Sequence, residues 1–245
     1  MNNGVQYGRR SRRVPVIKLW GEVCREPGRV IDDVRTVRDD TVCVWIVVDR
    51  ERVGMLGRDT CGRFGVLPGA TLTEDLIGAI DAEVRERLCD RSAVRMLAAR
   101  SHSRAMLERK LVMRGHDRTT AALVGDRWEE RGAIDDARFA ESAVRNELAR
   151  RPAGRRLLEA KLAAKGVGRE ASKPAIDAAL ADRDELEDAL AVARKSVASI
   201  GRSLSEAGRD PAVVKRRTVG RLARRGFSHD SVRRAVEIAM EEVSL

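Results

Sequence analysis

The sequence predicts a mainly α-helical protein, built from tandem three-helix-bundle repeats that form a curved array behind a small N-terminal β element and a helix. Three observations predict this fold class. A short helical motif that closes on a glycine occurs three times, each copy is followed by a polar step and a second helical pattern, and the one β-branched run precedes residue 90. Self-similarity of this kind is typical of stacked repeat proteins.

Residues 1–29 are basic and show no sustained hydrophobic period, so we expect a flexible basic tail with at most an extended segment at 14–20. Residues 41–48 (TVCVWIVV) are β-branched and flanked by charges, which predicts a buried strand. Its predicted partners are residues 30–37 and 51–57.

A turn and a helix complete this N-terminal element, which spans residues 30–90. Pro68 and Gly69 predict the turn, and Thr73 is the predicted N-cap of a helix that ends near Asp90. The element is too small for an independent enzyme domain.

From residue 91 the pattern is wholly helical, in predicted repeats at 91–132, 133–181 and 182–245. The motif consists of two stripe positions four residues apart, a last-turn cation that complements the helix dipole, and a glycine that permits a left-handed cap. Its copies are Leu107, Lys110, Leu111, Arg114 and Gly115; Leu158, Lys161, Leu162, Lys165 and Gly166; and Thr218, Arg221, Leu222, Arg225 and Gly226.

In the first repeat we predict a short helix at 92–100, a second helix capped by Ser103, and a third at 119–131. In the second repeat Asp135 suits the N-cap of a long helix that ends near Arg150. Pro174 is excluded from a helix interior, so the third helix there is predicted to be short and to begin near Ser172.

The third repeat begins with an acidic helix start at 182–188 and contains a predicted linker at 201–209. Pro211 starts its second helix and Ser228 caps its last one. Across the three repeats, the residues predicted to be core are Leu107, Leu111, Leu158, Leu162, Leu222, Trp128, Phe139 and Phe227.

The formal net charge is +10, from 48 basic and 38 acidic residues. Basic residues concentrate at 1–29, 145–169 and 209–234, which indicates a partner with a negative field, either a nucleic acid or an acidic protein surface. The alternative is that these patches serve only solubility in an arginine-rich protein.

Several function classes are disfavoured. Three Trp, three Phe and one Tyr are too few for a base-stacking platform, and the four cysteines lack a CxxC pair, which argues for free thiols rather than zinc. Asp135 and Asp136 are adjacent and point in different directions on a helix, so we interpret them as capping residues. Without a nucleophile, a phosphate-binding loop or a metal cluster, we expect no enzyme, cofactor or metal. No apolar run is long enough to span a bilayer, so we expect a cytoplasmic protein without a membrane partner.

The stretches SRAMLERKLVMRG, AIDDARFAESAV, LLEAKLAAKGV and RRGFSHDSVRRAV, taken in this order, resemble the RecX family of RecA modulators. The resemblance covers residues 91–240. Pro174 and Thr218 depart from the family pattern, and the basic tail has no counterpart in it.

The resemblance implies a crescent of three-helix bundles in the groove of a RecA filament on single-stranded DNA. A monomer bound there would limit filament growth and depress ATP hydrolysis, strand exchange and repressor coproteolysis, and thereby modulate recombination, DNA repair and the SOS response.

We predict that matched basic positions of the repeats contact the filament. They are Lys110, Arg114, Arg155, Arg156, Lys161, Lys165, Arg217, Arg221, Arg224 and Arg225. Arg114, Lys165 and Arg225 have a competing structural interpretation, because a cation before a capping glycine stabilises its own helix end. Arg155, Arg156 and the run 215–217 have less structural explanation and are the stronger candidates.

The competing function is direct DNA binding, because three-helix units with a basic helix can resemble helix-turn-helix domains. The sequence favours the filament regulator, since the cations flank helix ends in three repeats instead of collecting on one recognition helix. A nuclease would need an acidic metal cluster, which we do not find.

Overall fold

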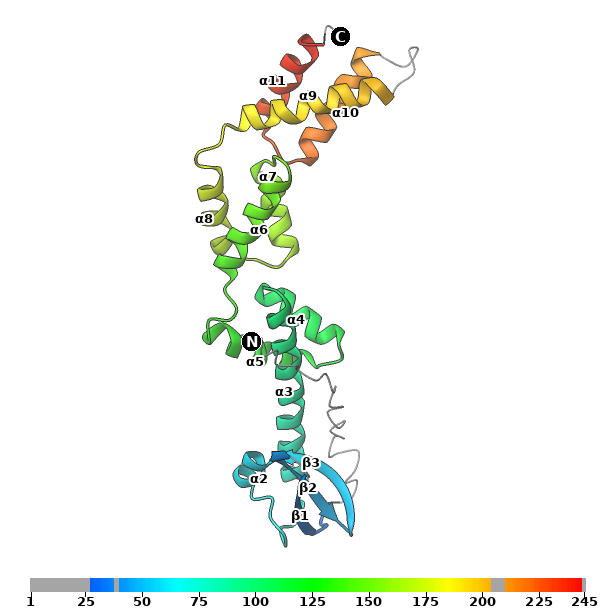
Figure 1. The fold of residues 1–245 in the computed structure, drawn as a ribbon, viewed down its shortest axis with the longest axis vertical. Coiled ribbons are helices and arrows are strands. Elements are labelled where there is room, and N and C mark those ends of the chain that lie inside the picture. Colours follow the sequence, from blue (N-terminus) through cyan, green and yellow to red (C-terminus); the bar gives the residue numbers. More distant parts are fainter. Residues whose placement is uncertain (1–26, 38–39, 204–209, 244–245) are drawn as a thin grey trace, which may run out of the picture. The chain divides into compact units, whose positions relative to one another are not determined.

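The computed structural model of the protein describes residues 27–37, 40–203 and 210–243. It divides into two compact units, Met1–Asp90 and Arg91–Leu245 (Figure 1). The extended segment predicted at 14–20 lies outside the described residues, as do most of the predicted tail and of the predicted linker.

The first unit contains an antiparallel sheet in the order β1-β2-β3, formed by Ile31–Val37, Asp40–Val48 and Glu51–Gly57. All three predicted strands are therefore confirmed. The hairpin between β2 and β3 turns at Asp49 and Arg50, whose φ angles of 49° and 62° are left-handed, as a two-residue hairpin turn requires.

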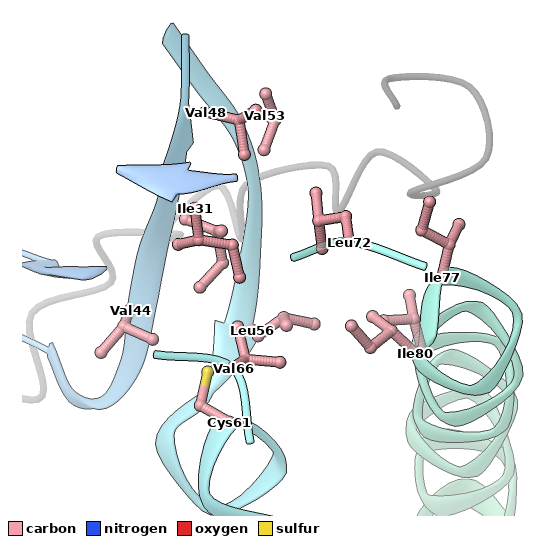
Figure 2. Packing of buried hydrophobic residues seen from close by; sticks show 12 residues of the cluster. Ile31, Val44, Val48, Val53, Leu56, Cys61, Val66, Leu72, Ile77 and Ile80 are labelled. Carbon is pink, nitrogen blue, oxygen red and sulfur yellow. The ribbon is translucent and has the colours of Figure 1, made fainter. Parts of the chain in front are cut away.

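One face of the sheet builds the core of this unit (Figure 2). Ile31, Val44 and Leu56 of the strands pack with Leu72 and with Ile80 of the following helix, and all are buried. Burial of such side chains contributes about 1.5–3 kcal/mol each, which explains how so small an element keeps its own core.

Two helices of the first unit differ from the prediction. Helix α2, Arg58–Phe64, was not predicted; it ends at Gly65 in the left-handed conformation. Helix α3 runs without a break from Glu74 to Ala99, so the predicted end near Asp90 and the separate helix at 92–100 are wrong. Ser92 lies inside α3, and its hydroxyl lies 2.9 Å from His116 Nε2.

The second unit contains the predicted tandem three-helix repeats, and a mainly helical fold with a small sheet is confirmed. Repeat 1 comprises the end of α3, α4 and α5; repeat 2 comprises α6 to α8; and repeat 3 comprises α9 to α11. The bounds are α4 Arg104–Met113, α5 Arg118–Glu130, α6 Asp136–Arg150, α7 Arg155–Ala164, α8 Arg169–Leu180, α9 Glu185–Ser203, α10 Pro211–Arg224 and α11 His229–Glu241.

Helix ends are formed as the motif predicts. Gly115, Gly166 and Gly226 have φ angles of 92°, 74° and 79°, in the left-handed region that favours glycine. The predicted caps Ser103, Asp135 and Ser228 each accept a hydrogen bond from a backbone N–H in the first turn.

The structure corrects the prediction for α8. This helix begins at Arg169 and contains Pro174 within it, so it is neither short nor started near Ser172. The N–H that proline lacks would have bonded the carbonyl of Glu170 in the first turn. Both Glu170 and Pro174 are exposed, so water can satisfy that carbonyl.

Six of the eight predicted core residues are buried, the five leucines and Phe227. Trp128 and Phe139 are only half-buried. The Arg131 guanidinium lies 5.3 Å from the Trp128 ring centroid and Lys165 Nζ lies 5.4 Å from that of Phe139, so both rings present a face to a cation near solvent. Thr218 is buried at its stripe position, and its hydroxyl has no hydrogen-bond partner among the described residues.

Candidate partner-binding surface

The second helices of the repeats meet end to end at two places, which we call the 1–2 joint and the 2–3 joint. At the 1–2 joint the Ser103 hydroxyl at the start of α4 donates to the carbonyl of Lys165 at the end of α7, at 2.5 Å. Ala105 fills the space that a Cβ on Gly166 would need. Repeat 2 is thereby held against repeat 1.

The 2–3 joint is made by backbone atoms. The Gly154 N–H donates to Arg225 O at 2.9 Å and the Arg156 N–H donates to Gly226 O at 3.3 Å. The free amides at the start of α7 thus satisfy carbonyls just past the end of α10, and the two helix dipoles align head to tail. A Cβ on Gly154 would overlap the Gly226 carbonyl, so only glycine allows this approach.

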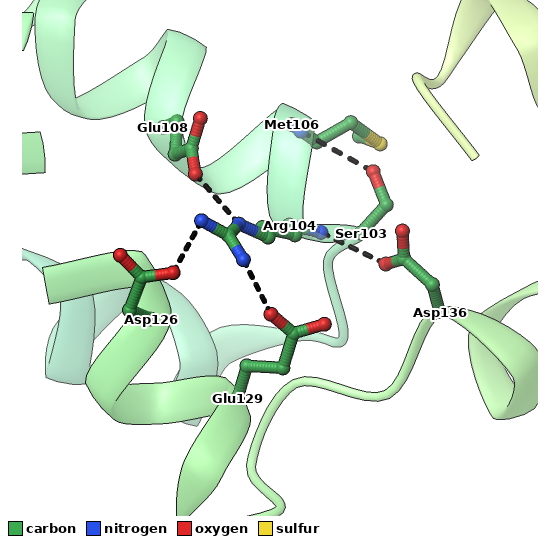
Figure 3. A network of polar contacts seen from close by, with 7 residues as sticks. All are labelled: Ser103, Arg104, Met106, Glu108, Asp126, Glu129 and Asp136. Carbon is green, nitrogen blue, oxygen red and sulfur yellow. Dashed lines mark hydrogen bonds and ion pairs between the residues drawn. The ribbon is translucent and has the colours of Figure 1, made fainter. Parts of the chain in front are cut away.

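Arg104 holds repeat 1 together (Figure 3). Its guanidinium lies 2.9 Å from Glu108, 2.5 Å from Asp126 and 2.6 Å from Glu129. These carboxylates raise the pKa of Arg104 above the ordinary value of an arginine. Its backbone N–H donates to Asp136 at 2.9 Å, which ties α4 to the start of α6. With all its charge compensated, Arg104 has a structural role.

In repeat 1 the predicted contact residues are Lys110 and Arg114. Lys110 Nζ lies 2.8 Å from His102 Nε2, and His102 Nδ1 lies 2.9 Å from Arg100 O. Burial, followed by the charge of Arg100, lowers the pKa of Lys110, and burial lowers that of His102. Because a lysine ammonium can only donate, His102 Nε2 accepts from Lys110 and the N–H of His102 Nδ1 donates to Arg100 O. Arg114 is exposed and, among the described residues, makes no ion pair.

In repeat 2 most predicted contact residues already have partners. Arg155 pairs with Asp177 at 2.6 Å, Lys161 pairs with Glu147, and Lys165 lies over Phe139. Arg156 is exposed and makes no ion pair with any described residue. Among the predicted contact residues of this repeat, Arg156 is thus the one whose charge remains available to a partner.

In repeat 3 Arg217 is exposed on α10, and Arg221, Arg224 and Arg225 come together beside the 2–3 joint. They line a hollow of about 690 Å³, which we call the cationic hollow, with three further cations that the sequence did not single out: Arg150, Arg151 and Lys195. Arg150 and Arg151 fall in a basic stretch of the sequence, but only tertiary packing brings α6, α9 and α10 to one place. The ten predicted residues therefore do not form one cluster.

The described residues include no group of three or more His, Cys, Asp or Glu side chains that could hold a metal ion. None of Cys43, Cys61 and Cys89 forms a disulfide bond with a described residue. None of the described helices is both long and apolar enough to cross a membrane.

The second unit of the chain consists of three-helix repeats that end in glycine caps, contact one another end to end and carry exposed cations. These features are typical of helical-repeat proteins that bind a partner. A family model of the second three-helix domain of RecX matches residues 135–180. The chain is 38% identical over 147 residues to the regulatory protein RecX of Mycobacterium sp. (strain JLS), covering 59% of this chain and 77% of that protein. It is 32% identical over 152 residues to the regulatory protein RecX of Chlorobaculum tepidum, covering 62% and 88%. The chain belongs to the RecX family.

Solved structures share the fold. A crystal structure of regulatory protein RecX matches with a TM-score of 0.64 and 19% identity, covering 85% of this chain and 98% of that chain. RecX from Lactobacillus salivarius matches with a TM-score of 0.50 and 18% identity, covering 64% and 97%. As a member of a family of regulatory proteins, this chain has a regulatory role.

Proposed function

We propose that this protein binds in the groove of RecA filaments on DNA and lowers RecA activity. The affected activities are filament extension, ATP hydrolysis, strand exchange and coprotease function, in recombination, DNA repair and the SOS response. The protein acts as a monomer without catalysis of its own, in the cytoplasm, where RecA filaments assemble.

The observation that carries this proposal is the pair of repeat joints. Hydrogen bonds between helix ends hold three similar units in a fixed order, so similar basic positions recur along one body. A filament repeats its own subunits, and a body with several weak contacts gains affinity there through effective concentration. No single cation has to supply the binding energy.

The test is DNA-dependent ATP hydrolysis by the cognate RecA on single-stranded DNA, with this protein titrated at substoichiometric amounts. One exposed cation without an ion pair is removed from each repeat, in the variant Arg114→Ala/Arg156→Ala/Arg217→Ala. We expect wild type to suppress hydrolysis, and the variant to need about tenfold more protein for half-suppression, because three contacts act together.

The matched control is Arg138→Ala/Arg194→Ala/Arg233→Ala. It removes the same charge from three arginines that pair with Asp135, Glu242 and Asp230. We expect it to suppress hydrolysis like wild type. Absence of suppression by the wild type at equimolar protein would refute the proposal. If both variants lose suppression of ATP hydrolysis equally, the effect comes from net charge and not from the predicted contact residues.

A further inference from the structure

The cationic hollow has an unusual charge balance. Six of its lining side chains are cations and none is a carboxylate: Arg150, Arg151, Lys195, Arg221, Arg224 and Arg225. A second hollow at the 2–3 joint, of about 350 Å³, is lined by Glu185 and Asp188 as well as by arginines. The accumulation of positive charge is therefore specific to one side of the joint.

The fold fixes where these cations stand. Arg225 is bound through its backbone in the 2–3 joint, and its guanidinium lies 3.5 Å from Glu147 of α6. The Arg221 guanidinium lies 3.4 Å from the hydroxyl of Ser196, which is 1% exposed in the wall of the hollow. Two of the six cations are thus positioned before any ligand binds.

Helix-end stabilisation accounts for the five arginines of the cluster but not for Lys195. Arg150, Arg221 and Arg224 stand in the last turns of α6 and α10, and Arg151 and Arg225 are the C-cap residues of these helices, so each stands where a cation stabilises the helix by roughly 0.3–1 kcal/mol. Lys195 lies in the middle of α9, so the dipole gives no reason for it. Its neighbour Arg194 pairs with Glu242 at 2.8 Å, whereas Lys195 makes no ion pair with any described residue. Like charges that share a hollow repel, and an anion would relieve that repulsion.

The positive surface continues along α10. A neighbouring hollow of about 350 Å³ shares Arg221 and Arg224 and adds Arg216 and Arg217. A continuous track of cations suits a chain of regularly spaced anions better than one small anion. Neither hollow is lined by an aromatic ring or by an Asn or Gln side chain, so neither has the groups that stack on or read bases.

We propose that the cationic hollow is a binding site for the phosphodiester backbone of single-stranded DNA, without sequence preference. Arginine forks and a lysine would neutralise successive phosphates, with release of condensed counterions. This site does not depend on RecA and is distinct from the contacts of repeat 1. It would hold a strand at the 2–3 joint while other repeats meet protein.

The test is fluorescence anisotropy of a labelled mixed-sequence single strand, titrated with the full chain between about 50 and 200 mM salt. We expect Lys195→Ala/Arg224→Ala to weaken binding by about tenfold or more, and to reduce the slope of log affinity against log salt by about 1.4, which is roughly 0.7 for each phosphate of a single strand that is no longer neutralised. Arg150→Ala/Arg151→Ala, which changes another wall of the hollow, should give the same result.

The matched control, Arg194→Ala/Arg233→Ala, removes the same charge from paired arginines and should change the affinity by less than about twofold. Thermal unfolding confirms that the variants fold. The proposal is overturned if the hollow variants and the control variant bind the strand equally weakly. It is also overturned if the wild type does not bind the strand. If poly-glutamate binds more tightly than the strand and its binding is abolished by the same substitutions, the ligand is an acidic protein segment and the phosphate assignment is wrong.

Discussion

Glu147 is a carboxylate that pairs with two of the predicted contact cations. A cation that pairs with Glu147 has a structural role and is less available to a partner. The Glu147 carboxylate, on α6, accepts a hydrogen bond from Lys161 of α7 and lies 3.5 Å from Arg225 of α10, and only 14% of its side chain is exposed. The hydrogen bond from Lys161 is the main cause that lowers the pKa of Glu147, against an opposing effect of burial. Lys161 therefore ties α7 to α6 within repeat 2, and Arg225 ties repeat 3 to repeat 2.

The lowered pKa predicts a pH dependence of stability. A carboxyl whose folded pKa lies below its ordinary value of 4.5 stabilises the fold above that value, and this contribution is lost as the pH falls through the folded pKa. We expect Glu147→Gln to lower the free energy of unfolding by about 1–2 kcal/mol near pH 7, and to lose less stability than wild type between about pH 6 and pH 3. Urea unfolding at a series of pH values measures both effects.

Glu159→Gln is the control for this prediction, since Glu159 is exposed on α7 and pairs with no described residue. It should follow the wild-type curve within about 0.5 kcal/mol. Acid sensitivity that is the same in Glu147→Gln and in wild type would contradict the role assigned to Glu147.

At the scale of elements, the 2–3 joint explains why the N-cap of α7 is a glycine, Gly154. Gly154 and Gly168 are the N-caps of consecutive helices, both with extended backbone angles and no side-chain cap. Gly154 faces the carbonyl of Gly226, whereas a Cβ on Gly168 would meet open space. The two glycines have the same local role and differ in what stands opposite them.

This pair gives a prediction for the 2–3 joint. Gly154→Ala should lower the free energy of unfolding by about 1–3 kcal/mol more than Gly168→Ala, because the capping effect is common to both and only Gly154 is overpacked. Chemical denaturation of both variants measures the difference. If Gly154→Ala and Gly168→Ala lower the free energy of unfolding equally, the contacts of the 2–3 joint do not contribute to stability and do not hold the repeats in order.

The elements that the sequence predicts best are those with local signals. Caps such as Ser103 and Asp135 act within one turn, so they can be identified without tertiary information. The predicted helix end near Asp90 is wrong because one helix, α3, continues from the N-terminal element into repeat 1. Residues 79–99 contain no Gly or Pro that would end it. Pro174 does not stop α8 because Glu170, whose carbonyl it leaves without a helical partner, is an exposed residue, and exposure is a tertiary property.

At the scale of the whole molecule, different repeats present different surfaces. Val112, Met113 and Leu123 of repeat 1 are exposed, Met113 by 79%, whereas the 2–3 joint carries the cationic hollow. An array of this kind can meet protein and DNA at different repeats.

The cationic hollow is only half predictable from the sequence. Arg221, Arg224 and Arg225 follow one another along the end of one helix, so a local pattern identifies them. Arg150 and Lys195 belong to other helices, which converge on α10 only after folding. Their shared surface therefore has no signal in the local sequence.

The central claim is that the protein recognises the assembled filament. The most direct measurement is anisotropy of the labelled chain titrated with three ligands at about 200 mM salt: RecA filaments on single-stranded DNA held by a non-hydrolysable ATP analogue, RecA without DNA, and the same strand alone. We predict that the filament binds at least about tenfold more tightly than either component, because only the filament engages several repeats at once. Equal affinity for the filament and the naked strand would contradict the account and leave a DNA-binding repeat protein.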